Sequence, residues 1–546
     1  MNAPLARRRP LLLGSALAAA ACAAALLATS PTLPMTWDEG NAIHRASQIP
    51  GKWLYTTRLE GHPEIEGHPA FYGIVIALGR WVSSGWLPPL VAARFGPIML
   101  FALAAGAMFY RMGRDFSVAA AAGSVASLIL MPRMFTHAHF ASIDGPLTSC
   151  WILVWATFVP AARGRVVQAE VSETAVRRRM NWPATLLFGI TLGMTLGSKA
   201  TGWLAPVPLL IWAAVYRDRT AAKVLGVGMP IALLTFFLLN PPLWHAPIAR
   251  WQEFFYLNFN RSATGLNIPT WFLGRMYNLD YTLPWYNTLF WTGVTVPVAI
   301  LALAGVGIAR AVGRRRTERL AVLLLANWLI LIIVRALPGT PPHDGIRLFL
   351  PAFAFLAALA GVGCGVVLSW SRNAYKSPRR VRATAVLLLL LAITTAGNLF
   401  IYSPQWLSYY NILIGGLPGA TATGMEPTYY WDGLDHSVLD WLHEQTDEDE
   451  RILFGASSPE NFALMRRWGT LRREWFVPDP RASYIAVDRY RWYVLQRRPS
   501  GLSETDKWLI ENAEPAHRKT LLGVPLVEVY ACEDYRQAWA ATTNED

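Results

Sequence analysis

The sequence predicts a mainly α-helical protein that crosses a membrane many times and ends in a small α/β domain. Of its 546 residues, 53% are hydrophobic and only 16% are charged, whereas soluble domains carry about 25% charged residues. Long apolar runs separated by short polar stretches account for this composition. Together these observations exclude a single soluble domain, a disordered chain and a fibrous repeat.

The apolar runs predict a bundle of about eleven transmembrane helices over residues 1–402, because a crossing helix needs about 20 apolar residues. The runs are 11–30, 89–110, 116–134, 144–162, 184–198, 202–216, 222–240, 286–310, 320–337, 347–370 and 384–402. The first run follows an arginine-rich start, which also suits a cleaved signal peptide. Its apolar core is longer than the roughly 7–15 residues usual there, which favours a retained span.

One further apolar segment, 70–86, is short and contains Arg80. If this segment does not cross, the basic clusters that flank the spans all fall on the side of the N-terminus, as the positive-inside rule requires. If it crosses, every later cluster lies on the opposite side. We therefore expect a juxtamembrane or re-entrant segment on the outer face. The net charge of +13 is then a signal of topology and does not indicate a nucleic-acid partner.

Three large polar pieces are expected outside the membrane: the loops 31–88 and 241–285, and the domain 403–546. In this last domain, residues 436–445 are expected to form a helix capped by Asp435. Short apolar stretches predict strands at 452–455, 484–487 and 524–530.

Two adjacent carboxylates, Asp38 and Glu39, follow the first span directly. A carboxylate at a partly desolvated interface can have a raised pKa and serve as a general base. The alternative is structural, because Asp38 or Thr36 could cap a helix over 39–48.

A second acidic position, Asp144, opens a span, where an ionisable residue is costly and indicates function. Helix capping is the alternative, since Pro146 suits the start of a helix. His137 and His139 lie close by, but two imidazoles are a weak basis for a metal site. The sequence therefore predicts no certain cofactor and leaves a divalent cation open.

Two basic residues, Lys199 and Arg347, break the positive-inside pattern because they are expected at the outer ends of spans. Their side chains suit an anionic lipid phosphate. Snorkelling of Lys199 and pairing of Arg347 with Asp344 are the alternatives. Such a layout suits chemistry on a lipid-linked phosphate, in which a base activates a hydroxyl and cations stabilise the departing phosphate.

The sequence resembles the lipid-dependent membrane glycosyltransferases of the C-type fold, and among them the protein O-mannosyltransferase and aminoarabinose-transferase superfamily. The resemblance spans roughly residues 10–400 and follows the order of six motifs. These are Trp37-Asp38-Glu39, His68-Pro69, Ala93-Arg94-Phe95-Gly96, His139 through Asp144, Leu196-Gly197-Ser198-Lys199 and Arg347-Leu348-Phe349-Leu350-Pro351.

The resemblance implies an inverting transfer from a polyprenyl-phosphate sugar to a hydroxyl of a protein, lipid or glycan. It also implies a bacterial inner membrane, with the site and the C-terminal domain outside the cytoplasm. Its implied roles are Asp38 as base, Glu39 and Asp144 as positioning acids, Lys199, Arg347, His68 and His343 as donor-phosphate ligands, and His139 and Arg133 as their supports. The family often has Lys-Pro-Pro where this chain has His68-Pro69-Ala70, and His68 can replace that lysine only if it is protonated.

Two other functions stay open: a transporter or flippase of a lipid-linked substrate, and a non-catalytic assembly protein. A transporter is expected to carry ionisable residues near the midplane and an internal repeat. Here the ionisable residues gather at the outer ends of the spans, which favours surface chemistry. An assembly protein would not need Asp38.

Overall fold

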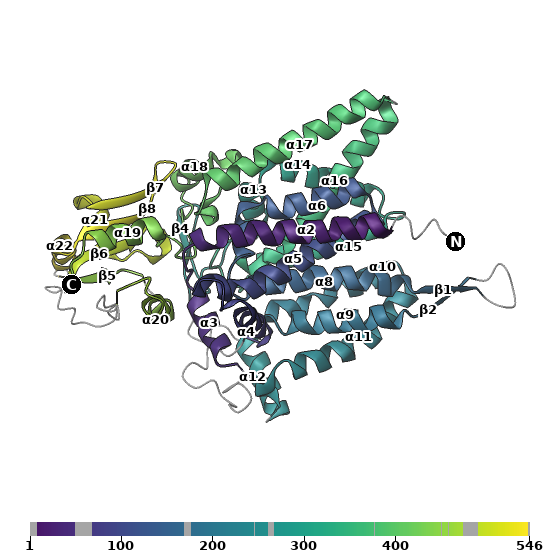
Figure 1. The fold of residues 1–546 in the computed structure, drawn as a ribbon, viewed down its shortest axis with the longest axis horizontal. Helices are drawn as coiled ribbons and strands as arrows, with labels where there is room; N and C mark the ends of the chain where they lie inside the picture. Colours follow the sequence, from purple (N-terminus) through teal and green to yellow (C-terminus); the bar gives the residue numbers. More distant parts are fainter. Residues whose placement is uncertain are drawn as a thin grey trace.

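The structure, a computed structural model, describes residues 8–49, 68–168, 176–244, 246–259, 267–375, 377–448, 450–456, 458–472 and 490–543. Long helices run side by side in one bundle, and the small α/β domain lies at one end of it (Figure 1). The prediction of a mainly helical membrane bundle is confirmed.

Seven helices in the described residues are long and apolar enough to cross a membrane. They correspond to α2 (Arg8–Thr29), α5 (Pro89–Asp115), α8 (Asp144–Arg163), α11 (Arg219–Leu238), α15 (Arg319–Ala336), α16 (Leu350–Tyr375) and α17 (Pro378–Ile401). Shorter apolar helices complete the bundle: α6 (Val118–Ile129), α9 (Trp182–Leu196), α10 (Pro206–Val215) and α14 (Val298–Gly313).

Prolines break two of the expected spans. The run 286–310 forms α13 (Asn287–Thr295) and α14, with Pro297 between them. The run 116–134 ends early with α6, and Pro132 begins the separate short helix α7 (Pro132–His137). A proline has no backbone N–H and its ring clashes with the preceding turn, so it suits the start of a helix and interrupts its interior.

The segment expected to stay on one face forms α4 (Phe71–Ser83), next to α3 (Glu39–Ser47) at the end of the bundle that carries the α/β domain (Figure 1). Its 13 residues are too few for a crossing. It packs tightly on α5, because a Cβ added to Gly79 would lie 2.3 Å from the backbone nitrogen of Gly96. These features agree with a segment that does not cross.

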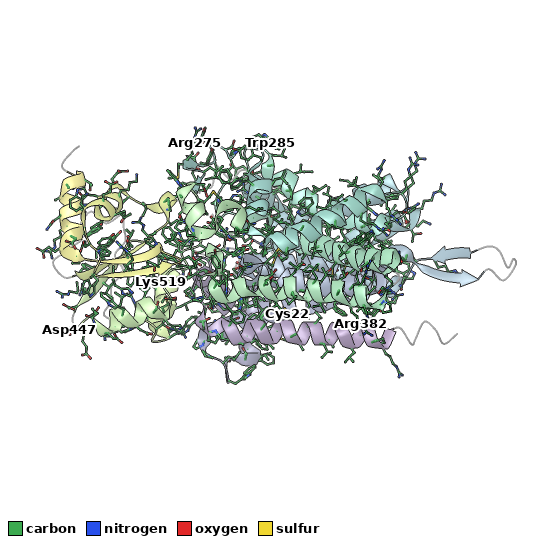
Figure 2. All side chains as sticks on the ribbon, turned by 90° about the horizontal axis from the view of Figure 1, so that it is seen from above. Cys22, Arg275, Trp285, Arg382, Asp447 and Lys519 are labelled. Atoms are coloured by element: carbon green, nitrogen blue, oxygen red, sulfur yellow. The ribbon has the colours of Figure 1, made fainter. Side chains whose placement is uncertain are left out.

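The opposite end of the bundle holds the start of α2, the hairpin of β1 (Arg165–Gln168) and β2 (Val176–Arg179), and the turn between α16 and α17 (Figure 1). Figure 2 shows Arg382 toward this end, far from Asp447 and Lys519 of the α/β domain. The basic clusters and the C-terminal domain therefore lie at opposite ends.

The C-terminal domain is built on a four-stranded sheet in the order β5-β6-β8-β7. The strands are β5 (Arg451–Phe454), β6 (Tyr490–Gln496), β7 (His517–Leu521) and β8 (Val524–Ala531), of which only β5 and β6 pair in parallel. The helices are α19 (His436–Glu444), α20 (Pro459–Arg467), α21 (Glu504–Asn512) and α22 (Cys532–Thr543).

The sequence predictions for this domain are largely confirmed. Helix α19 matches the expected 436–445, and the Asp435 carboxylate accepts a hydrogen bond from the Val438 N–H. Strands β5 and β8 match the expected 452–455 and 524–530, while 484–487 lies outside the described residues. Strands β6 and β7 were not expected, and the polar sequence of β7 gives no apolar signal.

Four further elements follow α11 in the chain or precede the sheet. These are α12 (Pro247–Phe259), β3 (Thr270–Phe272), β4 (Arg275–Tyr277) and α18 (Gly416–Ala422). The expected boundary at 403 begins a segment that packs on the bundle before the sheet starts, since Trp406, Tyr409 and Tyr410 are buried.

Candidate active site

A cavity of about 780 Å³ lies where the bundle meets the C-terminal domain. One part of its wall is apolar, with Leu204, Leu331, Val334 and Leu348. The polar part holds Asp38, Lys199, Arg335, Asp344, Arg347 and Arg498. Ligand sites are typically apolar cavities with a few placed polar groups, so this cavity is the candidate active site.

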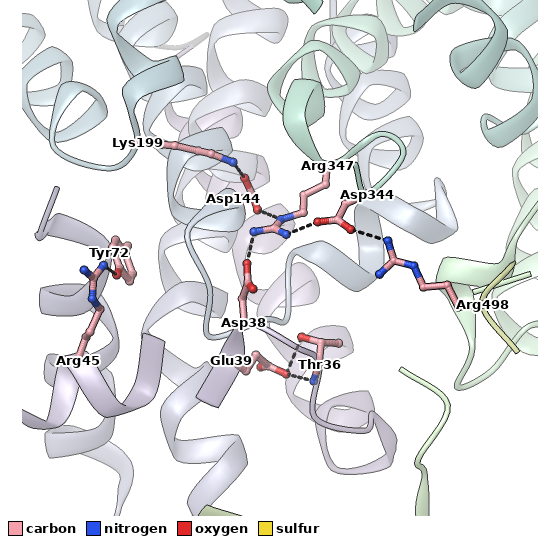
Figure 3. Close-up of polar contacts among 10 residues, drawn as sticks. All are labelled: Thr36, Asp38, Glu39, Arg45, Tyr72, Asp144, Lys199, Asp344, Arg347 and Arg498. Carbon is pink, nitrogen blue, oxygen red and sulfur yellow. Dashed lines mark hydrogen bonds and ion pairs between the residues drawn. The ribbon is translucent and has the colours of Figure 1, made fainter. Parts of the chain in front are cut away.

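The centre of the polar wall is Arg347, which begins the short helix η7 (Arg347–Phe349) ahead of α16. Its Nε donates to Asp144 Oδ2 at 2.7 Å, and its Nη1 donates to Asp344 Oδ2 at 2.6 Å. Its Nη2 donates to the Asp38 carboxylate (Figure 3). One guanidinium thus joins three carboxylates from distant parts of the chain.

Two more cations complete this network. Lys199 Nζ donates to Asp144 Oδ1 at 2.7 Å, and Arg498 Nη2 from the C-terminal domain donates to Asp344 Oδ1 at 3.2 Å. Figure 3 shows Lys199 and Arg498 on opposite sides of Arg347. Burial lowers the pKa of Lys199, and Asp144 opposes that change. Burial acts to raise the pKa of Asp344, but Arg347 and the other charged neighbours together hold this pKa below its usual range.

Local structure explains how these side chains meet. Asp144 opens α8, where a carboxylate is stabilised by the helix dipole. Lys199 precedes the turn η4 (Ala200–Leu204), in which a Cβ on Gly202 would lie 2.1 Å from the Thr195 oxygen. Only a glycine allows that close approach.

Asp38 is the most accessible carboxylate of this network. It occupies the N-cap position of α3, but its side chain makes no capping hydrogen bond. The side chain is 28% exposed, against 1% for Asp144. The capping role that the sequence left open is therefore not the one this carboxylate plays.

Glu39 points away from the cavity. Its fully buried carboxylate accepts from Arg94 Nε at 2.8 Å and Nη2 at 2.7 Å, and also from Thr36 and the Ala141 N–H. The structure thus brings Asp38 and Asp144 together with Lys199 and Arg347, but it places Glu39 in a separate ion pair.

Two predicted phosphate ligands, His68 and His343, line the cavity. Burial lowers the pKa of His343 to about 3, with Asp344 opposing the shift. Its imidazole is therefore neutral near pH 7. A neutral ring can donate one hydrogen bond but brings no positive charge to a phosphate.

The two predicted supporting residues lie behind the cavity wall. His139 bonds to the Thr29 hydroxyl at 2.8 Å and to the Phe135 carbonyl at 2.8 Å. Arg133 donates to the Tyr409 carbonyl at 3.0 Å, and its guanidinium lies 4.4 Å from the ring centre of Tyr410. In the part of the chain that the structure describes, no group of three or more His, Cys, Asp or Glu could hold a metal ion.

Arg335 and Arg498 line the cavity and were not expected from the sequence. Arg335 lies in the last turn of a span, where an ionisable residue is itself a signal of function. Trp431 has a φ of 56°, which is rare for a bulky side chain and often marks functional sites. Arg498 carries no sequence signal, because only folding brings it to Asp344.

No protein-family model and no curated protein sequence matches this chain. Solved structures do. ArnT from Cupriavidus metallidurans in the apo state superposes with a TM-score of 0.53 at 13% identity, over 96% of this chain and 99% of that one. The same protein bound to undecaprenyl phosphate gives 0.50 at 14%, over 94% and 98%.

The archaeal oligosaccharyltransferase AglB from Archaeoglobus fulgidus, in complex with an inhibitory peptide and a dolichol-phosphate, gives a TM-score of 0.52 at 12% identity. The match covers 89% of this chain and 69% of that one. At these identities the likeness concerns the fold. The chain has the fold of the C-type membrane glycosyltransferases, as its resemblance implied.

Proposed function

We propose that this protein is a membrane glycosyltransferase that moves a sugar from a polyprenyl-phosphate donor to an acceptor hydroxyl. The acceptor belongs to a protein, a lipid or a glycan. The observation that carries the proposal is the accessible carboxylate of Asp38, held by Arg347 in a cavity with one apolar and one polar wall. A lipid tail fits the apolar part, and a sugar and a phosphate fit the polar part.

Asp38 is the base in this proposal. Its carboxylate takes the proton of the acceptor hydroxyl as that oxygen bonds to the anomeric carbon of the sugar. The bond from this carbon to the phosphate oxygen breaks, and the polyprenyl phosphate leaves with the electron pair. Because attack and departure occur on opposite faces, the configuration is inverted. Arg347 orients the Asp38 carboxylate before the transfer, because its Nη2 donates a hydrogen bond to that carboxylate.

Asp144 and Lys199 position the catalytic groups. Asp144 accepts from both Lys199 and Arg347, so it fixes the guanidinium that holds Asp38. Glu39 acts further away, because it holds the start of α3 through Arg94 and Thr36. Fixing a base in reach of its substrate is a large part of catalysis.

The membrane orientation is part of the proposal. The start of α2, the β1–β2 hairpin and the turn between α16 and α17, where basic residues gather, lie at the end opposite the C-terminal domain (Figure 1), and basic residues face the cytoplasm. The active site and C-terminal domain then face the outside of the bacterial inner membrane. Likeness to ArnT bound to undecaprenyl phosphate supports a lipid-phosphate donor on that side.

The test is transfer of a radiolabelled sugar from its polyprenyl phosphate into an acceptor fraction of membranes. Asp38→Asn should lower transfer about 10³-fold, while Asp440→Asn, at an exposed carboxylate of α19, should leave it intact. Unchanged transfer by Asp38→Asn contradicts the catalytic assignment. Movement of the intact lipid-linked sugar across vesicles, without transfer, would indicate a flippase.

A further inference from the structure

Arg335 differs from three other cations of the cavity wall, Lys199, Arg347 and Arg498. Lys199, Arg347 and Arg498 are each within ion-pair distance of at least one carboxylate. Within the described residues, no carboxylate lies within 4.0 Å of the Arg335 guanidinium. A cation of the cavity wall that has no carboxylate partner can bind an anionic group of a ligand.

The Arg335 side chain is buried, with 6% of its surface exposed. Its Nη1 donates to the Thr340 hydroxyl at 3.2 Å, and its Nε has no hydrogen-bond partner among the described residues. Burying a guanidinium without an anion costs free energy. A fork of unused N–H donors fits the oxygens of a phosphate.

The surroundings indicate which phosphate fits. Arg335 lies in the last turn of α15. The same cavity is lined by Val334, which precedes it, by Leu331, one turn earlier, and by Leu204. An apolar wall that leads to a buried cation matches a phosphate on a hydrocarbon chain. Free phosphate would gain nothing from this wall.

We propose that Arg335 binds the phosphate of the lipid donor. This inference rests on the proposed function and names the residue that holds its donor. The expected ligands Lys199 and Arg347 then serve mainly to hold Asp38 and Asp144, since their N–H groups already donate to carboxylates. The phosphate lies beside that network, under the guanidinium of Arg335.

The experiment measures binding without transfer. Purified protein in nanodiscs is titrated with undecaprenyl phosphate, with undecaprenol and with inorganic phosphate. We expect Arg335→Gln to weaken undecaprenyl phosphate binding about 10- to 100-fold, the usual worth of charged hydrogen bonds. Undecaprenol binding should not change, and inorganic phosphate should bind far more weakly than the lipid. Arg319→Gln, at the other end of α15, is the matched control.

The outcomes separate the two proposals. If the wild-type protein binds no undecaprenyl phosphate, both proposals fail. If it binds and Arg335→Gln binds equally well, only the Arg335 assignment fails. An equal loss of affinity for undecaprenol also overturns the assignment, because undecaprenol has no phosphate and the substitution must then have changed the shape of the cavity. If Arg335→Gln does not fold, Arg335→Lys must bind the phosphate lipid more weakly than the wild type, and equal affinity overturns the assignment.

A separate observation concerns the C-terminal domain. Asn461 of α20 is buried, and its side-chain amide contacts the chain on both sides of Asp38. Its Oδ1 accepts from the Gly40 N–H at 2.8 Å, and its Nδ2 donates to the Thr36 carbonyl at 2.8 Å. A Cβ on Gly40 would lie 2.2 Å from Asn461 Oδ1, so the contact needs glycine there.

This contact replaces a missing cap. The first N–H groups of a helix need acceptors, which the N-cap side chain usually supplies. In α3 the N-cap residue Asp38 supplies none, and Asn461 accepts from Gly40 instead. Trp37 adds a backbone bond to Tyr430 at 3.3 Å and lies 5.8 Å from the Trp431 ring. The Asp38 carboxylate is thereby left for Arg347.

We infer that Asn461 is a positioning residue for Asp38, so that the C-terminal domain completes the active site. This also rests on the proposed function. Asn461→Ala should lower kcat about 10- to 100-fold, because a small misplacement of a catalytic group has that cost. KM for the donor should not change. Asn461→Asp keeps the acceptor for Gly40 and should retain part of the activity, and Asn512→Ala, an exposed asparagine of the same domain, should retain all of it.

A second readout needs no activity. Hydrogen–deuterium exchange of peptides covering residues 36–42 should speed up in Asn461→Ala but not in Asn512→Ala. Unchanged exchange and unchanged kcat overturn the inference. Faster exchange in every peptide of the C-terminal domain overturns it as well, since that is general unfolding. Faster local exchange in a protein without transferase activity supports the contact of Asn461 with the first loop but contradicts the proposed function.

Discussion

Two ionic clusters lie side by side in this protein, and two adjacent residues, Asp38 and Glu39, supply one acid to each. The cavity cluster consists of Asp38, Asp144, Lys199, Asp344 and Arg347. The buried pair consists of Glu39 and Arg94, each with no exposed side-chain surface. Both join carboxylates to guanidinium groups, yet one lines a cavity and the other does not.

The two clusters differ in how many hydrogen bonds their carboxylates accept and in how exposed these carboxylates are. The Glu39 oxygens accept from Arg94, Thr36 and Ala141. Asp38 makes its ion pair with Arg347 and stays 28% exposed. A fully satisfied buried network stabilises a single conformation, whereas a partly open carboxylate can exchange protons with a substrate. Carboxylates next to each other in sequence can thus serve structure and chemistry separately.

The largest expected effect is on the reaction. Asp38→Asn should lower transfer about 10³-fold, because a general base contributes roughly 10²- to 10⁴-fold. The unfolding temperature in detergent should stay near that of the wild type. Transfer assays and thermal unfolding on the same preparation check this, and a large loss of stability would mean that Asp38 is structural.

The opposite pattern is expected for the buried pair. Arg94→Gln leaves Glu39 buried without its cation, and breaking such a pair costs about 3–5 kcal/mol of stability. Thermal unfolding in detergent should show the loss, and protein that stays folded should still transfer sugar. Arg275→Gln, an exposed arginine of β4, is the control. A stability equal to that of the wild type would show that the Glu39–Arg94 pair does not stabilise the first outer loop.

A smaller effect is expected inside the cavity cluster. Lys199→Met removes one partner of Asp144, which keeps its hydrogen bond to Arg347. A charged hydrogen bond is worth about 1.5–3 kcal/mol, so transfer should fall about 10- to 100-fold. The donor binding constant should change little, because Arg335 is proposed to carry that role. If only donor binding is weakened, Lys199 is a ligand of the donor phosphate, as the sequence analysis expected.

The smallest effect concerns pH. Burial lowers the pKa of His343 to about 3, so the folded protein holds the neutral ring while the unfolded chain protonates near its ordinary pKa of 6.5. Its contribution to stability is therefore present above pH 6.5 and is lost as the pH falls toward 3. His343→Gln should reduce acid sensitivity between pH 6 and 4 and leave transfer at pH 7 to 8 unchanged. Unfolding temperatures measured across this pH range check the first effect, and a new break in the transfer profile near neutral pH would contradict the second.

Much of the fold could be predicted because apolar length is a local property. Every expected span contains a helix. The charge pattern predicted that the segment containing Arg80 does not cross the membrane, and this segment forms a short helix. The breaks in the other two spans follow from the positions of Pro132 and Pro297 in the sequence. Strand β7 was missed, because its half-exposed polar residues carry no apolar pattern.

The sequence alone determined the membrane class, the ends at which charge gathers and four residues that meet in one ionic network beside the cavity: Asp38, Asp144, Lys199 and Arg347. These follow from hydrophobicity and from the cost of charge near lipid, which act residue by residue. Only the tertiary structure separated Asp38 from Glu39 and brought Arg498 to Asp344 and Asn461 to the first outer loop. It also left Arg335, among the described residues, with no carboxylate within ion-pair distance. Those outcomes depend on which distant groups meet and which donors are already used, and no local pattern contains that information.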